Sequence, residues 1–136
     1  MKHRLVYVEL KSGFAGNGPA WIQLAQTSKS GATIYTNGKA LKSLKGSGIN
    51  ANYFDIETGE QYWVSGVKKN TQDRHWAGSG KVEIDEDAIR AYLSETGIHD
   101  LPSNLIRAQL QPGVQTHLHH QMENDSPSES DVVPLV

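Results

Sequence analysis

The sequence predicts a mainly β (α+β) protein. We expect a small half-open β-barrel or bent antiparallel sheet, SH3-like or OB-like, followed by one C-terminal helix and a flexible tail. Three observations predict it: short segments in which apolar residues alternate, Gly-rich turns between them, and a single switch to helical periodicity near residue 85.

The first strands can be read from alternation. "RLVYVEL", 4–10, alternates in two registers and predicts a strand. "AWIQLAQT", 20–27, and "ATIYT", 32–36, flank the turn "SKSG", 28–31, and predict a hairpin.

Turn signals place the following elements. Asn37-Gly38 is the strongest short turn signal in the chain, because both residues tolerate positive φ. The segment 39–48 that follows predicts either a strand or a short helix. A second hairpin is predicted over 52–67, turning at "ETGE", and a last strand over 80–84.

The helix is predicted over 85–97. Asp85 is the expected N-cap, the next two acidic residues suit the positive end of the helix dipole, and Gly97 is the expected stop. The expected apolar stripe consists of Ala88, Ile89, Tyr92 and Leu93.

Three regions follow from these elements. Residues 1–97 form the predicted barrel domain with its helix. Residues 98–121 form an extension, in which Ser103 could cap a short helix over 103–110. Residues 122–136 are acidic and Ser-rich and predict a disordered tail.

Charge is divided unevenly along the chain. Residues 1–81 hold eleven Lys and Arg against five acidic residues, a net charge of +6, and residues 82–136 hold two against ten, a net charge of −8. Such a division indicates a polyanion-binding surface, an acidic tail that folds back on the basic region, or two merely solvated regions, and charge alone leaves all three open.

The stretch "YWVSGVKKNTQDRHWAGSGK", 62–81, gathers cations and aromatic rings. Cations bind phosphates and flat rings stack on bases, so this composition is typical of a nucleic-acid binder. The alternative is a polar hairpin whose tryptophans lie in the core and whose lysines face water. For Trp63 we expect the core position, and for Trp76 both interpretations remain open. The predicted nucleic-acid-binding residues are Lys68, Lys69, Arg74, His75, Trp76 and Lys81, with Lys39, Lys42 and Lys45 from the loop 37–48 adding charge.

Catalytic signals are weak. Asp73 and His75 are two apart and could act as a general base, but no nucleophile is fixed beside them. "GSGK", 78–81, lacks the Walker A spacing, and the chain has no Cys. The "HLHH" run at 117–120 offers no secure third ligand, so we expect no specific metal site. We expect no cofactor, and a binding protein is favoured over an enzyme.

The run "YWVSGVKKN..DRHWAGSGK" resembles a family of short, uncharacterised bacterial proteins, and the resemblance covers roughly residues 4–97. It implies a self-contained bacterial, cytoplasmic domain and supplies no catalytic residue. No signal peptide is visible, and no apolar run approaches the ~20 residues of a membrane helix, so we expect no membrane partner.

Three functions follow, in this order. The first is a non-catalytic binding module that contacts DNA or RNA through the 62–81 segment. The second is a protein-interaction adaptor that uses the barrel edge or the C-terminal tail with its "VVPLV" end. The third is a small enzyme that uses Asp73 and His75.

Overall fold

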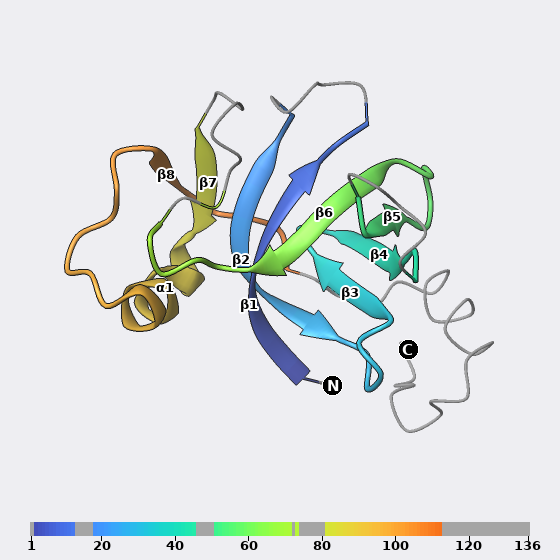
Figure 1. Ribbon diagram of the computed structural model, residues 1–136, viewed down its shortest axis with the longest axis horizontal. Coiled ribbons are helices and arrows are strands. Elements are labelled where there is room, and N and C mark those ends of the chain that lie inside the picture. Colours follow the sequence, from blue (N-terminus) through green and yellow to red (C-terminus); the bar gives the residue numbers. More distant parts are fainter. Residues whose placement is uncertain (1, 13–17, 46–50, 72, 74–80, 113–136) are drawn as a thin grey trace.

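A computed structural model describes residues 2–12, 18–45, 51–71, 73 and 81–112 of the chain. In this part of the chain eight β-strands form one continuous sheet, accompanied by one short helix (Figure 1). No helix in these segments is long and apolar enough to cross a lipid bilayer. The predicted tail, 122–136, lies outside the described residues.

Six strands form a closed antiparallel barrel. Their order around the barrel is β1-β6-β5-β4-β3-β2, and the pairing of β1 with β2 closes the ring. The prediction of a mainly β protein built on a small barrel is therefore confirmed, whereas SH3-like or OB-like kinship stays a prediction. The strands are β1 (Lys2–Leu10), β2 (Ala20–Thr27), β3 (Thr33–Thr36), β4 (Lys39–Ser43), β5 (Tyr53–Asp55) and β6 (Gln61–Gly66).

The three predicted turns, at 28–31, 37–38 and 57–60, each join two antiparallel strands. Asn37 and Gly38 join β3 to β4 with φ angles of 48° and 75°, as a tight turn with two left-handed residues requires. Gly59 has φ of 78° in the turn between β5 and β6. The segment 39–48, which could have formed a helix, begins as β4.

The barrel interior is apolar. Alternate residues of β1 and β6 point inward, and the rings of Trp21 and Tyr62 meet edge to face with centroids 6.0 Å apart. Trp63, between two inward residues of β6, points outward and is 37% exposed, so the expected core position of Trp63 is wrong. The interior residues are Val6, Val8, Leu10, Trp21, Ala25, Ile34, Leu41, Tyr62 and Val64.

A second layer covers the outer face of β1 and β2. Strand β7 (Val82–Asp85) pairs in parallel with β2, and β8 (Leu105–Ala108) pairs in parallel with β7. Between them lie a 3-10 turn, η1 (Glu86–Ala88), and helix α1 (Ile89–Thr96). The buried residues of this layer are Tyr7, Ala20, Ile22, Val82, Ile84, Ala88 and Tyr92.

The predicted helix is confirmed with a different beginning. Its apolar stripe packs on the second layer, and Gly97, with φ of 76°, donates its N–H to the Leu93 carbonyl. Asp85, however, makes no side-chain cap, because its carboxylate accepts the Leu110 N–H at 3.1 Å. The first turn, Glu86–Ala88, is 3-10 rather than α.

The short helix considered for 103–110 is wrong. Leu105 and Ala108 are spaced as a helix would space them, and Ser103 resembles a cap. The segment instead pairs with β7 in register from Val82↔Leu105 to Asp85↔Ala108. A free strand edge on β7 thus outweighs a weak local helix signal.

Candidate nucleic-acid interface

The outer face of β4, β5 and β6 carries an aromatic and basic stripe. Phe54 on β5 lies opposite Lys42 on one side and Gln61 on the other. Because Tyr62 and Val64 fill the interior, Gln61 and Trp63 share the outer face of β6. Trp63 is therefore a diagonal neighbour of Phe54, at a typical separation of about 7–8 Å.

We call this surface the Trp63 face; it comprises Lys11, Lys42, Phe54, Gln61 and Trp63. Phe54 and Lys42 are half-buried, whereas Trp63 and Gln61 are exposed. The Trp63 face thus brings an exposed ring, a half-buried ring and two lysines to the same side of the sheet.

Glu9 balances the charge beneath the Trp63 face. It lies opposite Trp63 in the β1–β6 pairing and is only 2% exposed. Its carboxylate accepts the Tyr7 hydroxyl at 2.7 Å and the Lys11 ammonium at 3.1 Å. The acidic partner of Trp63 is thus buried and paired with Lys11, so these two opposite charges largely offset each other.

The chain that leaves β6 presents two cations. Lys68 and Lys69 are both exposed. The Lys68 N–H donates to Asp73 Oδ1 at 2.6 Å, and the Thr71 N–H donates to the Lys68 carbonyl at 3.0 Å. Thr71 adopts a left-handed φ of 64° in this compact turn. The turn holds the two lysine backbones in place while their side chains remain in solvent.

Asp73, considered above as a catalytic carboxylate, stabilises this turn. Burial raises its pKa, while the Lys68 N–H and the Lys68 charge act in the opposite direction. Its second oxygen, Oδ2, is buried without a hydrogen-bond partner. His75 lies outside the described residues, so the Asp73–His75 hypothesis stays a prediction.

Tyr92 of α1 shares this environment. Its hydroxyl is also buried without a hydrogen-bond partner, and burial, followed by the nearby Asp73 charge, raises its pKa to about 12. Asp73 Oδ2 and the Tyr92 hydroxyl are therefore two buried polar groups without hydrogen-bond partners near the turn that carries Lys68 and Lys69.

The remaining predicted residues fall into separate groups. Arg74, His75 and Trp76 lie outside the described residues. Lys81 is exposed just before β7, where its ammonium lies 3.5 Å from the Ser103 carbonyl.

In Figure 1, strand β4 lies on the right of the view, whereas the chain that leaves β6 runs to the left, towards α1. Lys39 is paired with the buried Asp55 at 3.9 Å, and Lys45 is exposed with φ of 55°. Lys42 alone of the three belongs to the Trp63 face. Strand β6 connects the two groups, since it runs from the side of β5 to the turn that holds Lys68 and Lys69.

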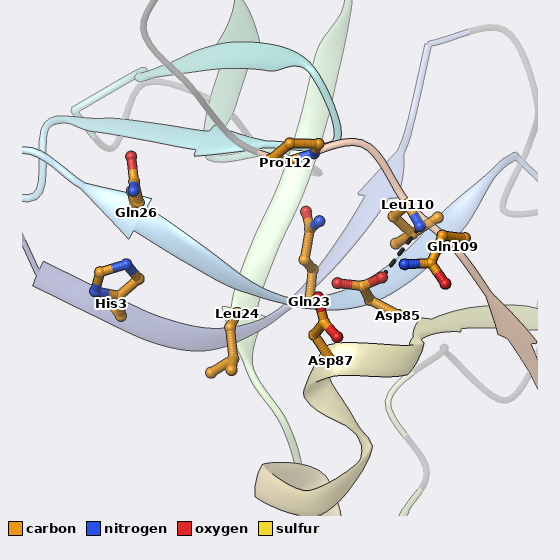
Figure 2. Close-up of a pocket in the computed structure, with 9 residues that line it drawn as sticks. All are labelled: His3, Gln23, Leu24, Gln26, Asp85, Asp87, Gln109, Leu110 and Pro112. Atoms are coloured by element: carbon orange, nitrogen blue, oxygen red, sulfur yellow. Dashed lines mark hydrogen bonds between the residues drawn. The ribbon is translucent and has the colours of Figure 1, made fainter.

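A polar pocket lies elsewhere on the molecule, between the ends of β1 and β2, the β7–η1 junction and the segment after β8 (Figure 2). Gln23 anchors one wall: its amide donates to the Gln111 carbonyl at 2.8 Å and accepts the Thr36 hydroxyl at 2.7 Å and the Asn37 N–H at 2.8 Å. These bonds fasten the segment after β8 to the β3–β4 turn.

No pattern in the sequence predicted this pocket. Its lining side chains are scattered from His3 to Pro112, and its acidic residues were assigned only to the start of the helix. Among the described residues, no group of three His, Cys, Asp or Glu side chains is placed to hold a metal ion.

Comparison of the chain with protein-family models, with curated proteins and with solved structures finds no match.

Proposed function

We propose that the protein is a non-catalytic module that binds single-stranded nucleic acid on the Trp63 face. The observation that carries the proposal is the outward orientation of Trp63, 37% exposed on a closed barrel that has a complete apolar interior without it. Trp63 is not among the residues that fill the barrel interior, so packing of the interior does not require a tryptophan at this position.

Stacking is the expected first contribution. A base that stacks on an exposed aromatic side chain gains about 1–3 kcal/mol, and every base offers such a face. Trp63, with Phe54 diagonal to it, provides the rings on the sheet surface. Binding of this kind tolerates many sequences, and it favours a single strand over a duplex whose bases are already stacked.

Phosphate contacts are the expected second contribution. Lys68 lies five residues beyond Trp63, a distance of at most about 17 Å along an extended chain, so a short oligonucleotide can reach both. Lys42 lies at the other end of the stripe. With a few phosphate contacts, log K should fall with log salt with a slope of about −0.7 per contact.

The test is a titration of a fluorescent mixed-sequence oligonucleotide of about 12 nucleotides, at about 50 and 200 mM salt. We expect salt-sensitive binding that weakens at least about tenfold in the Lys68→Glu/Lys69→Glu double variant. Lys29→Glu, which reverses an exposed charge in the β2–β3 turn, is the matched control and should bind nearly as wild type does. Equal binding by the double variant would refute the phosphate contacts, and no binding at low salt would refute the function.

A second candidate, the protein-interaction adaptor, is favoured by β8. This strand is the last of the sheet order and pairs with β7, and Ile106 on it is 45% exposed. An exposed sheet edge with an apolar side chain can accept an added strand from a partner. Ile106→Lys should abolish capture of such a partner and leave oligonucleotide binding unchanged, which separates the two functions.

A further inference from the structure

The polar pocket is a cavity of a size that suits a small molecule. Its volume is about 420 Å³, within the range of about 300–1,000 Å³ that is usual for ligand sites. It lies on the β1–β2 side of the barrel, beside the start of α1, and shares no residue with the Trp63 face (Figure 2).

The charge of the cavity is negative. Asp85 and Asp87 contribute carboxylates, and the described residues that line the cavity include no Lys or Arg. Asp85 is 5% exposed; one of its oxygens accepts the Leu110 N–H, and the other faces the cavity (Figure 2). A carboxylate that has lost most of its water and points an oxygen into a cavity is stabilised by a cation there.

The rest of the cavity is suited to a hydrocarbon stem. Leu24, 38% exposed, and Pro112 supply apolar surface. His3 and Gln26 lie at the end away from the carboxylates, where they offer hydrogen-bonding groups (Figure 2). The cavity therefore combines an acidic end, an apolar middle and a polar far end.

We propose that this cavity binds a small alkylammonium compound. The ammonium group lies between Asp85 and Asp87, the methylene stem lies along Leu24, and a polar group at the other end of the compound reaches His3 or Gln26. Ammonium suits the site because it donates three hydrogen bonds to carboxylate and amide oxygens.

Other ligand classes fit the same residues less well. An anion would face two carboxylates, and no Lys or Arg from the described segments lines the cavity to balance them. A transition metal would need a third close ligand, and the described residues hold no such group of three. The inference is independent of the Trp63 face, so either can fail without the other.

The experiment follows backbone amide NMR signals of the full chain during titration with 1,4-diaminobutane. Two compounds of the same chain length serve as controls: 1,4-butanediol, which lacks charge, and succinate, which carries the opposite charge. We expect the diamine, and neither control, to shift the amides of Leu24 and Leu110 in a saturable way below about 10 mM.

Variants then assign the binding to the carboxylates. Asp85→Asn removes the charge but keeps an acceptor for the Leu110 N–H, and it should weaken diamine binding at least about tenfold. Asp87→Asn, at an exposed position, should weaken it about threefold without changing Tm, which keeps the test valid if Asp85→Asn fails to fold. Asp100→Asn, exposed beyond α1, is the control and should bind as wild type does.

Three results would overturn the proposal. They are the absence of amide shifts near the cavity up to about 10 mM diamine, equal binding of 1,4-butanediol, and unchanged binding in both the Asp85→Asn and Asp87→Asn variants.

Discussion

The outer surface of the barrel has two regions that differ in whether other elements cover them. One is the outer side of β1 and β2, and the other is the outer side of β6. On β1 and β2 the outward side chains, such as Tyr7 and Ile22, are buried under β7 and α1. On β6 the outward Trp63 remains 37% exposed. Covering an apolar face is what stability alone would favour. Our proposal is that a bound nucleic acid covers the ring of Trp63, which the fold leaves exposed.

The largest expected effect is on the free energy of unfolding, when one residue from each of the two regions is replaced by alanine. Ile22→Ala should cost about 2–5 kcal/mol of unfolding free energy, because Ile22 is fully buried in the second layer. Trp63→Ala should cost less than about 1 kcal/mol, because much of its surface is already in water. Urea unfolding of both variants checks this; comparable losses would mean that Trp63 has a structural role.

The second prediction concerns the hydrogen bonds by which the Gln23 side chain joins β2 to the β3–β4 turn and to the segment after β8. Gln23→Leu should cost about 2–4 kcal/mol, because it leaves the Thr36 hydroxyl, the Asn37 N–H and the Gln111 carbonyl without their partner. Gln26→Leu, a half-buried neighbour on β2, is the control and should change the midpoint little. Similar unfolding midpoints for the two variants would show that the segment after β8 is held by other contacts.

The third prediction compares two buried tyrosines of the second layer. Tyr7→Phe should cost about 1–3 kcal/mol, because the buried Glu9 loses a hydrogen bond. Tyr92→Phe should be neutral or stabilise by up to about 1 kcal/mol, because the lost hydroxyl has no partner. Thermal unfolding of the pair measures the difference, and an equal loss in both would require a hidden partner for Tyr92.

The fourth prediction concerns alkaline pH. Burial raises the pKa of Tyr62 and Tyr92 to about 12 from the ordinary value of 10.0. A raised pKa in the folded state contributes stability that is complete below pH 10 and is lost as pH rises through 12. Circular dichroism should show unfolding in that window, and Tyr92→Phe should make the transition shallower. Unfolding well below pH 10 would contradict this assignment.

The smallest effect is expected at Asp73. Its raised pKa means that the folded state favours the protonated acid, so this group lowers stability as pH rises from its ordinary value of 3.8 through the raised one. Asp73→Asn keeps an acceptor for the Lys68 N–H and should remove that dependence. The difference between wild-type and variant Tm from pH 3 to 7 measures it; a constant difference would place Asp73 in solvent.

Local signals were enough to predict much of the fold. Asn37-Gly38 and Gly59 mark turns by the φ angles that they allow, and Gly97 marks the end of the helix. These features depend on a few neighbouring residues, so the sequence carries them directly.

Features set by distant residues were not predictable. Period-two alternation says that Tyr62 and Trp63 face opposite sides, but both are aromatic, so alternation alone cannot say which side is the interior. The residues 105–108 became a strand because β7 offered an edge. The cavity at Asp85 depends on residues more than a hundred positions apart, and no local pattern records that.

The most direct test of the Trp63 face is the affinity of Trp63→Ala for a single-stranded oligonucleotide, measured beside Leu24→Ala. The two side chains are 37% and 38% exposed, so the pair controls for the loss of exposed apolar surface. We predict that Trp63→Ala weakens binding about five- to hundredfold, the equivalent of one stacked base, and that Leu24→Ala binds as wild type does. Equal affinities for Trp63→Ala and wild type would contradict the account.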